Sequence, residues 1–270
     1  MQDDSPKEGQ PRWGERLFAG CPTLERDGRI ELSERIEVGA RGGADYLVMM
    51  LLSSALASLG LIQGSTAVVI GAMLVAPLMG PLIGAGLALI QGNLRLFRKS
   101  IGVTLMGIGI GLAVSLGIGL INPGFEPSLE IEARGTPDLF DLAIAFFSGM
   151  AAAYASGRPN VAGTLAGVAI AAALVPPLAV VGLAFTNGLP WLAGNAAILL
   201  VTNLVAIILG AAIIFRLFGV QTAPRQPVSS SWSRKAILSL SLVAILLVAP
   251  LFIQMIEKRR AGQARPCLLY

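Results

Sequence analysis

The chain has 270 residues, of which 54% are hydrophobic and only 13% are charged, and its mean hydropathy is +0.74. This composition excludes an ordinary soluble globular domain and predicts an integral membrane protein, with the lipid bilayer as its main partner. The excess of 20 Lys and Arg over 16 Asp and Glu falls in loops and at the ends of apolar runs, so no nucleic acid is expected as a partner.

The chain begins with a polar N-terminal tail at residues 1–41, where Ile30, Leu32, Ile36 and Val38 predict a short, weakly amphipathic helix. Seven apolar runs follow, and each is long enough to cross a hydrocarbon core of about 30 Å, which takes about 20 residues. They occupy residues 44–62, 66–90, 100–121, 139–156, 161–186, 191–215 and 236–256.

Two polar, proline-containing segments at 122–138 and 219–235 interrupt these runs and predict exposed loops. The expected organisation is therefore a first transmembrane repeat at 42–121 and a second at 139–218. A seventh helix with a basic tail occupies 236–270.

The positive charges predict the orientation of these spans. With seven spans, 15 Lys and Arg residues lie on the side of the N-terminus and five on the other side, which predicts a cytoplasmic N-terminus. The same count favours a full crossing at 66–90 over a re-entrant hairpin. A hairpin would leave Arg95, Arg98 and Lys99 on the outer side.

An internal repeat is present. A shift of 96 residues aligns Asp45–Gly92 with Asp141–Gly188 without a gap, and 12 of the 48 pairs are identical. The second apolar run of each copy carries a proline pair, Pro77 with Pro81 and Pro176 with Pro177. Proline removes a backbone donor and clashes with the preceding turn, so a broken helix is expected in each half.

Three spans per copy is an odd number, so the second copy enters the membrane from the opposite side. The predicted fold is an all-α, polytopic transmembrane bundle with a 3+3 inverted repeat. The alternative is that apolar composition alone produces the alignment and that the prolines are ordinary kinks.

Three motifs resemble a known family, the hydrophobic membrane proteins that contain domain of unknown function 389 (DUF389). They are "GLIQGSTAVVIGAMLVAPLMGPLIG" from Gly60, "IAAALVPPLAVVGLA" from Ile170 and "VTNLVAIILGA" from Val201. The resemblance covers roughly residues 40–218. It implies a polytopic protein of a prokaryotic cytoplasmic (inner) membrane, and it implies no settled activity.

The residues that could carry chemistry are few. Histidine is absent and the two cysteines, Cys21 and Cys267, lie at opposite ends of the chain, so no metal site and no cofactor are expected. No charged residue lies in the middle of an apolar run, which disfavours a carboxylate-driven pump. No nucleophile and base form a recognisable pair, so an enzyme is not expected.

Asp45 and Asp141 are equivalent in the repeat, and each lies near the start of a span, where it either caps a helix or has a gating role. A polar site is expected instead where the two proline breaks meet near the middle of the bilayer. The candidate residues for that site are Pro77, Pro81, Pro176, Pro177, Thr164, Thr202 and Asn203. Asn203 either bonds an adjacent helix or contacts a ligand.

Paired broken helices in an inverted repeat are typical of transporters. The sequence therefore favours a transporter or channel-like permease for a small solute or ion. The alternative is a structural or accessory subunit of a larger membrane complex, and a homo-oligomer is expected for the permease.

Overall fold

The computed structural model describes residues 26–124, 127–134, 138–158, 163–220 and 238. All regular secondary structure in this part of the chain is helical. The elements are α2 (Arg26–Gly39), α3 (Ala44–Ile62), α4 (Thr66–Val75), α5 (Met79–Gln91), α6 (Leu94–Ile121), α7 (Leu129–Arg134), α8 (Leu139–Ser156), α9 (Gly163–Thr186) and α10 (Pro190–Leu217).

The lengths and compositions of these helices indicate a membrane protein. Within the described residues, five helices are long and apolar enough to cross a membrane, and six spans result if the bent pair α4–α5 counts as one. The five are α3, α6, α8, the Ala169–Thr186 part of α9, and α10. Apart from Leu238, the predicted seventh span at 236–256 lies outside the described residues.

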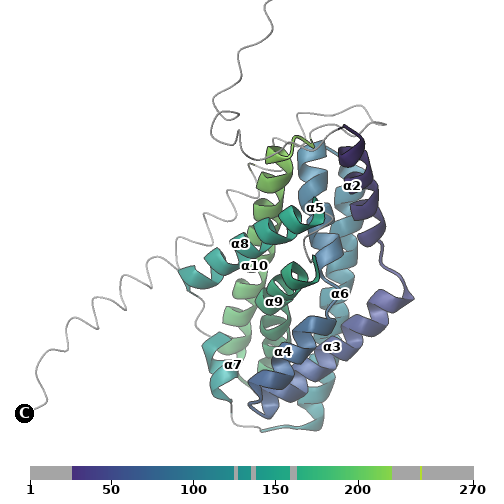
Figure 1. Cartoon of the computed structure of the whole chain (residues 1–270). Helices are drawn as coiled ribbons and strands as arrows, with labels where there is room; N and C mark the ends of the chain where they lie inside the picture. Colours follow the sequence, from purple (N-terminus) through teal and green to yellow (C-terminus); the bar gives the residue numbers. More distant parts are fainter. Residues whose placement is uncertain (1–25, 125–126, 135–137, 159–162, 221–237, 239–270) are drawn as a thin grey trace, which may run out of the picture.

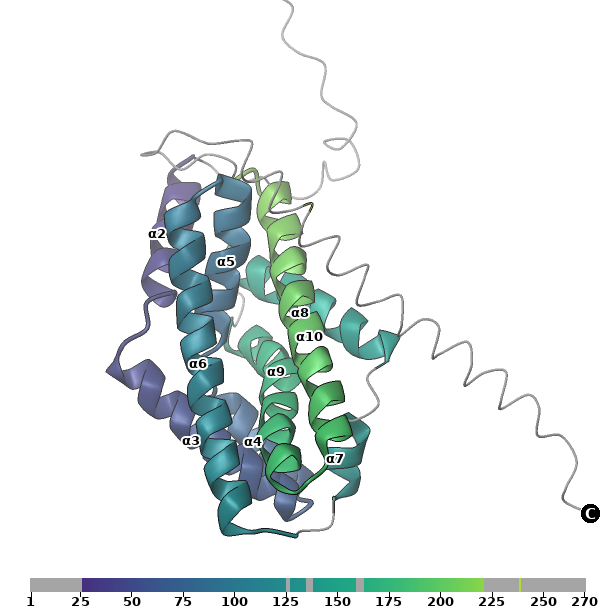
Figure 2. The same cartoon turned by 180° about the vertical axis from the view of Figure 1, so that it is seen from behind.

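The centre of the bundle is α9. It packs against α3, α4, α6, α8 and α10, and 76% of its Ala169–Thr186 segment is buried, whereas only 28% of the best apolar window of α6 is buried. The two 28-residue helices, α6 and α10, run along the length of the bundle on either side of α9 (Figures 1 and 2).

The pair α4–α5 also runs along the bundle. Figure 1 shows α4 at the end of the bundle that holds the C-terminal end of α6, and α5 at the end where α6 begins. The two helices are bent by 56° relative to each other. A two-residue turn with Gly92 at φ 67° then connects α5 to α6. The pair α4–α5 therefore continues along the bundle and does not fold back on itself.

Glycines let α8 and α10 approach each other closely. A Cβ atom added at Gly149 would overlap the carbonyl oxygen of Ile207, and one added at Gly210 would overlap that of Phe146. Because lipid supplies no hydrophobic drive for helices to associate, such close backbone contact is a main source of attraction between them.

The predicted short helix of the N-terminal tail is present as α2, but only part of its predicted apolar set is buried. In α2 the buried apolar residues are Leu32 and Ile36, which are one turn apart, whereas Val38 is 60% exposed. Positions 30, 32, 36 and 38 do not lie on one face of a helix with 3.6 residues per turn. The segment 122–138 is not simply an exposed loop, because it contains α7 and the buried Ile131. The Ser128 hydroxyl donates a 2.8 Å hydrogen bond to the Leu61 carbonyl and ties this segment to the end of α3.

The glycine contact predicts a difference between two matched substitutions in α10. Gly210→Ala should lower stability by about 1–3 kcal/mol, because the new methyl group forces α8 away from α10. Gly194→Ala lies in the same helix in open space and should be neutral or stabilising by up to about 1 kcal/mol. Thermal unfolding of the full chain in a neutral detergent measures both. Equal effects of the two substitutions would contradict the role of Gly210.

Candidate functional site

The first proline pair produces the predicted break. Ala76 has φ −66° and ψ 123°, which is the extended conformation that a following proline imposes. Pro77 therefore lies in the break between α4 and α5. Pro81 is the third residue of α5, where a backbone N–H would have no acceptor within the helix.

The break leaves carbonyl groups at the end of α4 without helical donors, and a neighbouring helix supplies one. The hydroxyl of Ser53 in α3 donates a 2.8 Å hydrogen bond to the carbonyl of Ala72, and Ser53 is fully buried. An unpaired carbonyl in lipid would cost several kcal/mol, so this bond makes the end of α4 tolerable inside the bundle. Ser53 was not among the residues predicted from the sequence; the only signal was three serines, at 53, 54 and 58, in an otherwise apolar run.

The second proline pair does not break its helix, which corrects the prediction of a broken helix in each half. Both Pro176 and Pro177 lie inside the continuous α9. Pro177 has no N–H for the carbonyl of Ala173, four residues earlier. The side-chain Nδ2 of Asn203 in α10 donates a 2.9 Å hydrogen bond to that same carbonyl. A donor from a second helix therefore replaces the one that proline lacks, and α9 continues.

Asn203 has a second feature. It is the fourteenth of the 28 residues of α10, is only 3% exposed, and its side-chain Oδ1 has no hydrogen-bond partner among the described residues. Two other buried side-chain oxygens, Gln91 Oε1 and Ser100 Oγ, also have no hydrogen-bond partner among the described residues. Both lie near the turn between α5 and α6. Asn203 thus places a free acceptor halfway along a span.

Three other buried hydroxyls bond within their own helices. The side chains of Thr202, Thr104 and Ser148 donate to the carbonyls four residues earlier, at distances of 2.7, 3.0 and 2.6 Å. Bonds of this kind leave little donor capacity for a ligand. The side chain of Thr164 lies outside the described residues.

The two aspartates lie away from this region. Asp141 forms a capping box with Asp138 at the start of α8: its carboxylate accepts from the Asp138 N–H, and the Asp138 carboxylate accepts from the Asp141 N–H. Asp45 lies in the first turn of α3 and is exposed. Among the described residues, no group of three His, Cys, Asp or Glu side chains is arranged to hold a metal ion.

Comparisons with known proteins identify relatives but no activity. The family model "Domain of unknown function (DUF389)" matches residues 73–209, just over half of the chain. Uncharacterized protein MJ0678 of Methanocaldococcus jannaschii is 32% identical over 209 residues, which are 77% of this chain and 63% of that protein. The chain thus spans less than two thirds of that relative's length. No solved structure matches significantly.

The bond between Asn203 and Ala173 predicts a non-additive pair of substitutions. Asn203→Leu should destabilise the protein by about 1–2 kcal/mol, because it leaves the Ala173 carbonyl buried without a donor. Pro177→Ala supplies the missing backbone N–H. In the Pro177→Ala background, Asn203→Leu should therefore cost less than half as much.

Thermal unfolding of the four proteins in one detergent measures this double-mutant cycle. Additive effects of the two substitutions would show that Asn203 does not replace the proline donor.

Proposed function

The chain belongs to the DUF389 family, and from this premise we propose that it is a transporter or channel-like permease for a small solute or ion in a prokaryotic cytoplasmic membrane. The proposed site lies between the α4–α5 break and the Pro176–Pro177 segment of α9, with Asn203 as its central polar residue. The proposal includes a 3+3 inverted repeat, in which α3 to α6 and α8 to α10 are the two halves.

The observation that carries the proposal is the buried, unpartnered Oδ1 of Asn203 beside the Ala173 carbonyl. A polar oxygen without a partner in a low-dielectric interior costs free energy unless a ligand or water satisfies it. Oxygen acceptors attract a cation or a solute with N–H or O–H groups. This chemistry favours a cation or a neutral, hydrogen-bond-donating solute over an anion.

The surroundings support the same proposal. A discontinuous helix, α4–α5, packs against the central helix α9, and discontinuous helices are frequent at the binding sites of transporters. Among the described residues, no Asp, Glu, Lys or Arg lies in the middle of a long apolar helix. The site would then act through amide and backbone dipoles and would need no titrating carboxylate.

A flux assay tests the function. The full chain is reconstituted into lipid vesicles, and the permeation of K⁺, Na⁺, urea and glycerol is compared with that of protein-free vesicles. We expect faster permeation for at least one of these four probes. The double variant Pro177→Ala/Asn203→Leu should lower it roughly tenfold, which corresponds to about 1.4 kcal/mol in the barrier.

Pro177→Ala alone is the matched control, because it keeps the Asn203 oxygen. The double variant should fold, since the backbone N–H at position 177 bonds the Ala173 carbonyl. Permeation equal to that of protein-free vesicles for all four probes would contradict a permease and would favour the accessory-subunit alternative. Equal flux in the control and the double variant would remove Asn203 from the site.

The orientation is tested by cysteine labelling in a variant that lacks Cys21 and Cys267. Asn122→Cys lies at the exposed C-terminal end of α6, and Glu34→Cys lies on an exposed face of α2. With a cytoplasmic N-terminus, a membrane-impermeant maleimide should label position 122 in intact cells and position 34 only after permeabilisation. The reverse pattern would mean the opposite orientation.

A further inference from the structure

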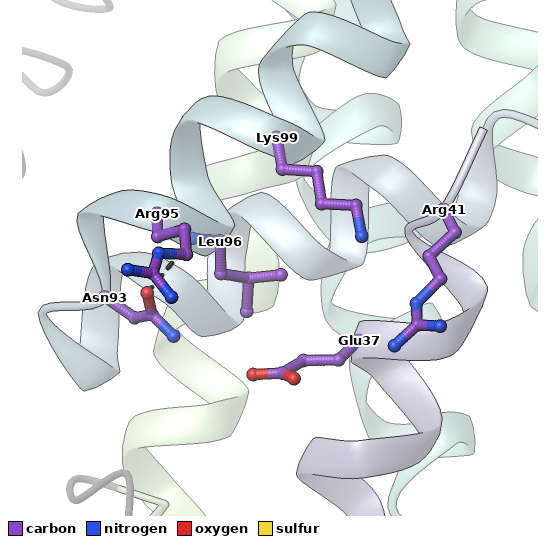
Figure 3. Close-up of a pocket in the computed structure, with 6 residues that line it drawn as sticks. All are labelled: Glu37, Arg41, Asn93, Arg95, Leu96 and Lys99. Atoms are coloured by element: carbon purple, nitrogen blue, oxygen red, sulfur yellow. Dashed lines mark hydrogen bonds between the residues drawn. The ribbon is translucent and has the colours of Figure 1, made fainter. Parts of the chain in front are cut away.

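A pocket of about 180 Å³ lies between the C-terminal end of α2 and the start of α6 (Figure 3). Its lining residues are Glu37, Arg41, Asn93, Arg95, Leu96 and Lys99. The pocket is far larger than the roughly 30 Å³ that one water molecule occupies in the liquid. It therefore has room for a polyatomic group.

The described residues that line the pocket carry a net positive charge. Three basic side chains and one carboxylate line it, which leaves a formal charge of +2. Among the described residues, Arg41, Arg95 and Lys99 form no ion pair. Figure 3 shows Arg41, from the segment that follows α2, and Lys99, from α6, extending toward the same space. Unpaired cations that converge in this way attract an anion.

A second, independent feature points to the same kind of ligand. Asn93 is the N-cap of α6 and is only 8% exposed, and its Oδ1 accepts a 3.0 Å hydrogen bond from the Leu96 N–H. The Nδ2 amide has no acceptor among the described residues, and in Figure 3 it points toward the carboxylate end of Glu37, across the pocket. This amide group lines the pocket and is therefore a donor available to an oxyanion there. The positive end of the α6 dipole adds to the attraction.

The position along α6 indicates where such an anion would come from. At about 1.5 Å per residue, the 28 residues of α6 extend about 42 Å, which exceeds the roughly 30 Å of a hydrocarbon core. The basic residues Arg95 and Lys99 lie in its first two turns, and the apolar part follows. The pocket therefore lies at the level of the lipid headgroups.

We propose that this pocket binds a phosphate oxyanion, either of an anionic lipid headgroup or of a soluble phosphate compound. Arg41, Arg95 and Lys99 supply the charge, and the Asn93 amide supplies a neutral donor. Glu37 repels a bare phosphate and accepts a hydrogen bond from a hydroxyl group next to it, such as one on a glycerol headgroup. This inference does not rest on the permease proposal.

Ligand-dependent thermal stabilisation of the full chain in a neutral detergent tests the proposal. The probes are phosphatidylglycerol, phosphatidylcholine and inorganic phosphate, with sodium chloride at equal ionic strength as the reference. We expect saturable stabilisation by phosphatidylglycerol or by inorganic phosphate. Phosphatidylcholine should stabilise less, because its quaternary ammonium group would meet the three cations.

Substitutions assign the effect to the pocket. In Arg41→Gln/Lys99→Gln the dissociation constant should rise on the order of tenfold or more, because two charge-assisted bonds are lost. The matched control is Arg98→Gln: Arg98 is exposed on the same helix, beside Lys99, but does not line the pocket. It should change the constant by less than about twofold, as expected of a surface charge. Glu37→Gln should tighten the binding of inorganic phosphate.

Each result decides the question. Binding of phosphatidylglycerol without binding of inorganic phosphate identifies a lipid site, and binding of both identifies a general phosphate site. Stabilisation by neither probe overturns the proposal, as does an equal loss in Arg98→Gln and in the double variant. If the double variant does not yield a monodisperse protein, Arg95→Gln and Glu37→Gln carry the same test, with opposite expected signs for inorganic phosphate.

Discussion

The structure depends on one constraint, which is that a backbone carbonyl inside a membrane bundle needs a donor where proline has removed one. The chain meets it in three ways. At Pro77 the helix stops, and Ser53 bonds the Ala72 carbonyl, next to the Met73 carbonyl for which Pro77 has no N–H. Pro81 lies in the first turn of α5, where no donor is needed. At Pro177 the helix continues, because Asn203 bonds the Ala173 carbonyl.

Close packing lets these short side chains reach the backbone of a neighbouring helix. It also keeps two polar regions apart. Serine and asparagine reach a neighbouring helix only when the backbones are near, and Gly60 allows such an approach between α3 and α4, because a Cβ atom added there would lie 3.1 Å from the Val69 backbone nitrogen. The region around Asn203 is uncharged and lies halfway along α10, whereas the pocket with Arg41 and Lys99 lies at the start of α6. Amide and carbonyl groups can be buried at the cost of hydrogen bonds alone, but unpaired charges require the polar headgroup layer.

Features that depend on local sequence were predictable. Apolar length determines where a helix can cross a membrane, and the predicted runs 44–62 and 139–156 coincide with α3 and α8. The break near Pro77 was predictable because a proline acts on the residue immediately before it and on the turn before that. The absence of charge from the middle of the apolar runs was equally visible, and with it the expectation of a site built from amides and carbonyls.

Features that depend on distant partners were decided by the tertiary structure. Taken alone, Pro176 and Pro177 predict a break, whereas α9 is continuous and a donor 30 residues away in the chain bonds the Ala173 carbonyl. Periodicity could not identify Ser53 as the residue that reaches α4, nor could it bring Arg41 beside Arg95 and Lys99. Hydropathy and proline chemistry act over one helical turn, so by themselves they determined the membrane-spanning helices and the first break. Which freed carbonyl is satisfied, and which charges share a pocket, follows only from how the helices pack.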